Sequence, residues 1–241
     1  MKKTLKYQLQ DLKLSIILFF LIYLTLFVFL SISLSAFTTS DSTGNNTISS
    51  MDVATTIFTL ILGFAIFKEY YWMAAQNGVS RKTFFKSSVY CILITDAILT
   101  VLSYISFVML NLIFKTAVLS QFELSYPTFE HNVFVTGITM ILFIFVTYNM
   151  FFMFGFFISV LFYRASKIGK ITIAAGLPIL IFFLLPISVS FIPGFWKKVI
   201  EFVLAVSGVA SGNPYYGIVT YTIITIIFGL LSYPLVKKAE I

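Results

Sequence analysis

The chain has 241 residues, of which 59% are hydrophobic and only 10% are charged, and its mean hydropathy is +1.01. Because about a quarter of the residues in an ordinary soluble protein are charged, this composition excludes a soluble globular domain and predicts an all-α integral membrane protein. The net charge of +7 comes from basic residues between apolar segments, which indicates membrane topology and contact with membrane lipids rather than nucleic-acid binding.

The cysteine and histidine content limits which disulfides, metal sites and catalytic sites the chain can form. Cys91 is the only cysteine and His131 the only histidine. A disulfide within the chain, a thiolate metal cluster and a His-pair metal site are therefore excluded. We expect no catalytic residue, no metal site and no cofactor in this chain.

The first 13 residues have the pattern of an amphipathic helix. Met1, Leu5, Leu9 and Leu12 recur at helical spacing, and lysines lie on the other faces. The pattern predicts a helix over residues 1–13 that lies in the plane of the membrane surface. The alternative is that these lysines only hold the N-terminus on the cytoplasmic side.

Six apolar segments predict six transmembrane helices in a single domain that covers residues 1–241. Each segment is close to or above the ~20 residues that a helix needs to cross a bilayer. The second is short, so we expect its helix to continue through Lys68 and Glu69. The predicted spans cover about residues 14–36, 51–67, 87–114, 133–163, 171–192 and 215–236.

Small residues and prolines predict local features of two spans. In the fourth, Gly155 and Ser159 form a small-xxx-small pair suited to close helix contact. In the fifth, Pro178 and Pro186 predict kinks, because proline cannot donate a helical hydrogen bond.

The segment before the last span is irregular. We expect residues 193–198 (Pro-Gly-Phe-Trp-Lys-Lys) to break the chain. The apolar stretch 199–206 that follows is too short to cross a bilayer. The sequence therefore predicts a re-entrant or interfacial segment before the sixth helix.

Residues 68–86 form the longest charged stretch between apolar segments of the chain. Their pattern predicts a helix, a tight turn and a second helix. Gly78 favours the end of the first helix because glycine tolerates the left-handed conformation. Ser80 can begin the second by accepting a hydrogen bond from the N–H of Thr83. A membrane protein does not need a structured loop merely to reverse its chain, so we interpret this segment as a docking element for a soluble partner. The alternative is that the aromatic residues 70–72 are only interfacial anchors of the second span.

Basic residues predict the topology. If six helices cross the membrane, thirteen of the 16 Lys and Arg residues fall on one side. They lie in the N-terminal segment, in residues 68–86, in residues 164–170 and at the C-terminus. The positive-inside rule then places both termini and the docking element in the cytoplasm.

Four polar residues within the predicted spans are candidates for function: Asp96, Asn111, Tyr148 and Asn149. Asp96 is the most suggestive, because an ionisable group in a bilayer is costly and by default functional. The alternative is that Asp96 lies near the interface or bonds to a neighbouring Tyr or Ser. For the other three, hydrogen bonds between helices are the commoner use, and contact with a substrate is the alternative.

The whole pattern resembles the type-2 class of ABC transporter permeases, most of which are exporters. The resemblance rests on the basic amphipathic N-terminus, six spans with both ends inside, a structured first cytoplasmic loop and a broken segment before the last span. Within the loop it rests on the run Gly78-Val79-Ser80-Arg81-Lys82-Thr83-Phe84-Phe85.

The resemblance implies a homo- or heterodimer of permease subunits on two ATP-binding subunits, which would hold ATP and Mg. Residues 68–86 would then be the main coupling element and residues 164–170 a second contact. The implied coupling residues are Glu69, Tyr71, Trp72, Met73, Gly78, Ser80, Arg81, Arg164 and Lys167. The chain has no Gly-x-x-x-x-Gly-Lys-Ser/Thr phosphate loop, so we expect that it is not the ATPase.

Small outer loops and few intramembrane charges favour export of amphipathic or hydrophobic molecules, such as antimicrobial or cytolytic peptides and drugs, across the bacterial cell membrane. A permease of the same class for polysaccharides or lipid-linked glycans is one alternative. A membrane immunity or scaffold protein that transports nothing is another. An intramembrane protease is disfavoured, because neither a nucleophile–base pair nor a metal-ligand set can be assembled from the spans.

Overall fold

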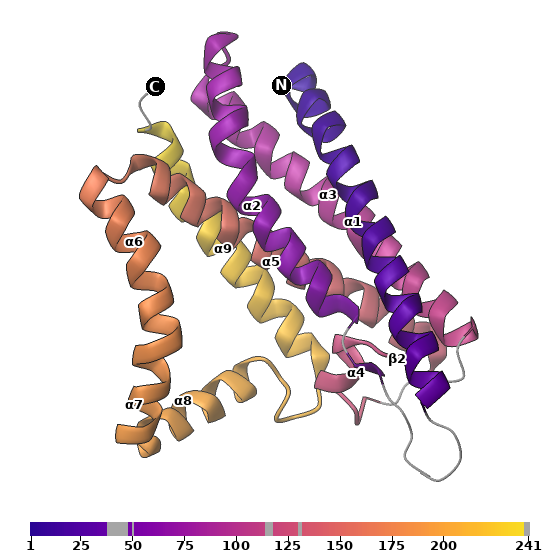
Figure 1. Cartoon of the computed structure of the whole chain (residues 1–241). Coiled ribbons are helices and arrows are strands. Elements are labelled where there is room, and N and C mark those ends of the chain that lie inside the picture. The colour runs from indigo at the N-terminus through magenta and orange to yellow at the C-terminus, as the bar shows by residue number, and fades with distance from the viewer. Residues whose placement is uncertain (38–47, 50, 114–117, 130–131, 239–241) are drawn as a thin grey trace.

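The computed structural model describes residues 1–37, 48–49, 51–113, 118–129 and 132–238. These residues form a bundle of long helices with a helical arm beside it, joined to the bundle at both ends (Figure 1). The bundle consists of α1 (Lys2–Phe37), α2 (Met51–Gln76), α3 (Arg81–Ile113), α5 (Val133–Arg164) and α9 (Pro214–Lys237). The arm consists of α6 (Lys167–Ile179), the π-helix η1 (Leu180–Leu184), α7 (Leu185–Phe191) and α8 (Pro193–Val206).

Within the described ranges, five helices are long and apolar enough to cross a membrane: α1, α2, α3, α5 and α9. The chain is therefore an all-α protein of multi-pass membrane character, as its composition predicts. The predicted fifth span, residues 171–192, is helical through Phe191 but is divided among α6, η1 and α7. A count of six spans is not confirmed.

The π-helix lies where the two prolines of this span predict a departure from regular helix. Pro186 cannot donate to the carbonyl four residues earlier, and its ring crowds that carbonyl. The N–H of Leu185 bonds instead to the carbonyl of Leu180, one residue further back than in an α-helix. The helix is therefore wider just before Pro186 and continues into α7.

The N-terminal segment is not separate from the first span. α1 is one helix of 36 residues, so the structure does not confirm a distinct in-plane helix over residues 1–13. Leu12 is buried, and Leu5 and Leu9 pack against the same core. The apolar face that the sequence suggests for the membrane surface contacts other helices of the bundle.

The chain breaks at Ile192, directly before the predicted segment, and residues 193–198 themselves are helical. Pro193 begins α8, because proline fits the first turn of a helix, where its missing N–H would have no partner in any case. The only departure from helix here is Ile192, with φ −131° and ψ 63°. α8 runs from α7 toward the start of α9, at the end of the molecule away from the start of α1 (Figure 1), and its role as an interfacial segment stays a prediction.

That same end of the bundle contains the short elements β1 (Ile48–Ser49), β2 (Val118–Leu119) and α4 (Gln121–Ser125). The strands pair in parallel, with Ile48 opposite Val118. The hydroxyl of the buried Tyr126 donates to the carbonyl of Ser207 over 2.7 Å. Burial raises the pKa of this hydroxyl above its usual value, so the proton needed for the bond stays in place.

α2 and α5 pack at close range, because Gly63 on α2 faces Gly155 on α5 and neither has a side chain that would keep the helices apart. A Cβ added to Gly63 would lie 2.8 Å from the backbone nitrogen of Phe156 and 2.9 Å from the Cα of Gly155. Ser159, one turn beyond Gly155, donates to the carbonyl of Phe64 over 2.8 Å. The predicted use of Gly155 and Ser159 for close helix contact is confirmed.

Candidate functional site at the turn between α2 and α3

The turn between α2 and α3 begins with a Schellman motif. Gly78 has φ +67°, the left-handed conformation that glycine adopts without strain. Its N–H bonds to the carbonyl of Ala75 over 3.0 Å, and the N–H of Val79 bonds to the carbonyl of Ala74 over 2.9 Å. These two bonds satisfy carbonyls that the end of α2 would otherwise leave free. The predicted helix stop at Gly78 is confirmed.

Two further contacts hold the start of α3. The hydroxyl of Ser80 accepts a hydrogen bond of 3.3 Å from the N–H of Thr83, as predicted for a helix cap. Arg81 donates from Nη1 to the backbone carbonyl of Lys237 over 2.8 Å. The turn is therefore fixed at both helix ends and attached to the end of α9.

Tyr71, predicted as an anchor for a partner, lies inside the bundle. Only 2% of its surface is exposed. Its ring stacks on Phe67 at 5.1 Å between centroids and meets Phe84 edge-on at 5.4 Å and Tyr163 at 5.7 Å. Tyr71 therefore stabilises the fold and is not available to a partner, and this part of the prediction is wrong.

Trp72 and Met73, the other predicted anchors, are on the surface, with 54% and 38% of their area exposed. Together with Lys68, Glu69 and Tyr163 they line an open cavity of about 500 Å³ between the ends of α2 and α5. The predicted residues of the second contact, Arg164 and Lys167, are exposed where α5 passes into α6.

The basic segments lie at one end of the molecule. The upper end of Figure 1 contains the start of α1, the end of α9, the turn between α2 and α3 and the passage from α5 to α6. These are the four regions that the charge pattern groups on one side. The fold therefore brings the predicted coupling residues to one end, while the side of the membrane on which that end lies stays a prediction.

Hydrogen bonds at this end join Gln8 on α1 to Ser87 and Ser88 on α3, and the sequence did not predict them. We call this group of three residues the clamp. Ser87 donates to the side-chain oxygen of Gln8 over 2.9 Å, and the side-chain nitrogen of Gln8 donates to Ser88 over 3.2 Å. All three residues are fully buried. Gln8 shares the apolar face of α1 with Leu5 and Leu12, and a polar residue at such a position is the signal that could have revealed the clamp.

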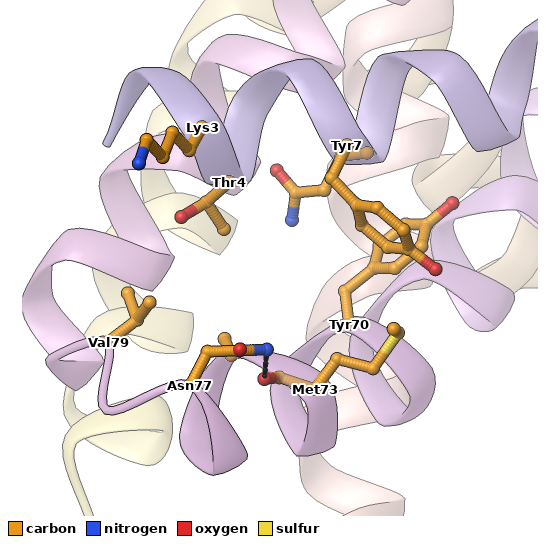
Figure 2. Close-up of a pocket in the computed structure, with 9 residues that line it drawn as sticks. Lys3, Thr4, Tyr7, Tyr70, Met73, Asn77 and Val79 are labelled. Atoms are coloured by element: carbon orange, nitrogen blue, oxygen red, sulfur yellow. Dashed lines mark hydrogen bonds between the residues drawn. The ribbon is translucent and has the colours of Figure 1, made fainter.

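A second cavity, of about 370 Å³, lies between the first turns of α1 and the last turn of α2. Figure 2 shows Lys3 and Thr4 on one side of it, Asn77 and Val79 on the other, and the rings of Tyr7 and Tyr70 at one end. The sequence analysis treated these positions as parts of separate helices. Their proximity depends on how α1 packs.

The polar residues predicted inside the spans do not form one site. Tyr148 on α5 is buried, with its hydroxyl 2.9 Å from that of Ser103 on α3, which is a bond between helices as predicted. Asn149 is buried and donates to the carbonyl of Phe145 over 2.8 Å. Asn111 is exposed near the end of α3 and bonds to the carbonyl of Phe107. None of these contacts indicates binding of a substrate.

Asp96 differs from the others. It is fully buried, and neither carboxylate oxygen has a hydrogen-bond partner among the described residues. The alternative that Asp96 bonds to a neighbouring Tyr or Ser is therefore wrong among the described residues, and its depth in the membrane stays a prediction. A buried carboxylate without a partner reduces stability, and such groups are typical of functional positions.

We expect Asp96→Asn to raise the thermal midpoint of the purified protein, because a neutral amide of the same shape costs less to bury than a carboxylate. The expected gain in the free energy of unfolding is about 1–3 kcal/mol. The measurement is thermal unfolding in detergent, alongside an assay of transport. A lower midpoint would show that Asp96 has a structural partner.

Gly78→Val should weaken the turn through the backbone alone. An added Cβ meets no atom within 4 Å, so no contact is broken, but valine resists the left-handed conformation by about 1–2 kcal/mol. Gly78→Asn is the matched control, since asparagine tolerates this conformation. Circular dichroism and limited proteolysis at the turn should separate the two variants; equal behaviour would show that φ at residue 78 is not under constraint.

No protein-family model, curated protein or solved structure matches this chain.

Proposed function

We propose that this chain is the membrane-spanning permease subunit of an ATP-driven exporter of the type-2 ABC class, and that it moves amphipathic or hydrophobic molecules out of a bacterial cell. The observation that carries the proposal is the turn between α2 and α3. Its backbone is fixed by a Schellman motif and a helix cap, and Trp72 and Met73 lie exposed beside it. Large exposed side chains on a rigid support are suited to bind a soluble subunit.

The helices beside the turn offer a path for mechanical coupling. α2 and α3 each run without interruption from the turn into their apolar segments. α2 contacts α5 closely through Gly63 and Gly155, and a hydrogen bond joins Ser159 to Phe64. A force applied at the turn would move α2 and α3 as rods and would pass directly to α5. This arrangement supports a role in which ATP hydrolysis outside the chain rearranges the membrane helices.

The proposal includes partners that supply what the chain lacks. A separate ATP-binding subunit would hold ATP and Mg, and a second permease subunit would complete the pathway. Both termini and the turn would face the cytoplasm, because the basic residues gather at that end. The interior of the bundle is mostly aromatic, aliphatic and hydroxyl-bearing with few charges, which supports an amphipathic or hydrophobic cargo.

Reconstitution tests this proposal. The chain is purified under mild solubilisation together with its bound proteins, and the complex is placed in inside-out vesicles with a fluorescent amphipathic peptide. We expect a subunit with a phosphate loop in the complex, ATP hydrolysis, and ATP-dependent accumulation of the peptide. Absence of both the subunit and the accumulation would contradict the proposal and favour an immunity or scaffold protein. Accumulation of a lipid-linked glycan in place of the peptide would assign the alternative cargo.

A further inference from the structure

We propose that the cavity between the start of α1 and the end of α2 binds the phosphate headgroup of an anionic phospholipid. The cavity has a volume of about 370 Å³ and lies between Lys3, Thr4 and Tyr7 on one helix and Tyr70, Met73 and Asn77 on the other (Figure 2). Met73 is the only lining residue that is also a predicted coupling residue, and a site for lipid goes beyond the proposed function.

The cavity exists because α1 is fastened at two places that leave its first turn apart from α2. The clamp of Gln8 with Ser87 and Ser88 draws α1 toward α3. On the α2 side, the hydroxyl of Tyr70 donates to the carboxylate of Asp11 over 2.7 Å. Between these two contacts and the N-terminus of α1, the first turn of α1 and the last turn of α2 leave an open space.

The groups around the cavity suit a phosphodiester. Lys3 supplies a positive charge and Thr4 a hydroxyl donor on the α1 side. The neighbouring Lys2 and Lys6 are exposed, and no lysine in residues 1–13 forms an ion pair with a described carboxylate. Asp11, the only acidic residue in this stretch, already accepts from Tyr70. A bound phosphate would supply the counter-charge that these lysines lack.

The apolar side of the cavity suits the rest of a lipid molecule. The rings of Tyr7 and Tyr70 meet edge-on with centroids 6.0 Å apart, and Met73 and Val79 also line the space. A free inorganic anion would leave these surfaces uncovered. A glycerol backbone with the first carbons of an acyl chain would cover them, which is why we commit to a lipid.

The depth of the cavity agrees with this occupant. α1 has 36 residues, so it is about 54 Å long at 1.5 Å per residue. Its apolar part, residues 14–36, is about as long as the ~30 Å hydrocarbon layer is thick. Residues 2–13 therefore extend beyond the hydrocarbon into the headgroup layer. Tyrosines are typical of that layer, and basic pockets there bind anionic headgroups.

The experiment compares the full chain with the double variant Lys3→Gln, Thr4→Val. Both proteins are placed in nanodiscs of phosphatidylcholine, alone or mixed with phosphatidylglycerol, and bound lipid is measured by native mass spectrometry after release. We expect preferential retention of phosphatidylglycerol by the unmodified chain. The variant should retain it about fivefold more weakly, since one lysine near an anionic surface contributes about that factor.

Lys86→Gln is the matched control, because Lys86 is an exposed lysine at the same end of the bundle that does not line the cavity. It should retain phosphatidylglycerol normally. Equal losses in the control and the double variant would show attraction by general charge and overturn the site. Equal retention of phosphatidylcholine would also overturn it. Competition by soluble glycerol phosphate at the same strength would show a site for free anions and not for a lipid.

Discussion

Replacing both Trp72 and Met73 by Ala is expected to weaken association with the ATP-binding subunit by roughly 30-fold or more while the membrane subunit still folds. The two side chains are 54% and 38% exposed, so the bundle loses little packing when they are removed. At an interface, loss of a central aromatic anchor costs about 2 kcal/mol or more, which corresponds to roughly a 30-fold weaker complex. Co-purification of the subunit in detergent and stimulation of its ATPase activity measure the effect.

Two comparisons make this result specific. Tyr90→Ala with Leu93→Ala removes side chains of similar exposure, 50% and 40%, from a part of α3 that lies away from the turn, and should leave the complex intact. Tyr71→Ala should instead reduce the yield of folded protein, because Tyr71 belongs to the core. If the Trp72 and Met73 variant retains the subunit and its coupled activity at the normal level, the turn is an ordinary loop and the proposed function is wrong.

The largest expected loss of folded protein follows from Gly155→Ala combined with Gly63→Ala. A Cβ on Gly155 would lie 3.1 Å from the Cα of Gly63 and 3.2 Å from the backbone nitrogen of Phe64, and it would overlap the carbonyl of Leu60. All of these are backbone atoms, which cannot move aside like the end of a side chain. The helices must separate, at a cost of about 3 kcal/mol or more.

Gly194→Ala provides the control for this pair of substitutions. An added Cβ at Gly194 meets nothing within 4 Å, and alanine is favoured over glycine inside a helix by up to about 1 kcal/mol. We therefore expect Gly194→Ala to keep or raise the thermal midpoint and the double variant to lower it strongly. Equal midpoints for the two proteins would show that α2 and α5 are not in close contact.

The sequence predicted best those features that depend on neighbouring residues. The stop at Gly78 and the cap at Ser80 follow from backbone chemistry within four or five positions, and both are present. The long apolar helices follow from composition in the same way. Pro193 shows the limit of this reasoning, because proline ends one helix and begins another equally well, and only the surrounding packing selects between the two.

Features that depend on distant parts of the chain were not predictable. Tyr71 and Trp72 are adjacent and both aromatic, so the sequence does not indicate which one faces the bundle. The burial of Tyr71 depends on Phe84 and Tyr163, which belong to two other helices. The clamp at Gln8 likewise requires Ser87 and Ser88, about 80 residues away. The cavity beside α1 exists only once that clamp has formed.

The bond from Arg81 to the end of α9 has a consequence for inherited variation in this protein. Its acceptor is the main-chain carbonyl of Lys237, a group that every amino acid has. Missense changes in codon 237 therefore leave the acceptor in place, and this hydrogen bond does not constrain which residue stands there. A stop codon at the same position removes the carbonyl and releases an arginine 156 residues earlier in the chain. A nonsense allele at this codon should therefore destabilise the turn between α2 and α3, whereas a missense allele should leave it intact.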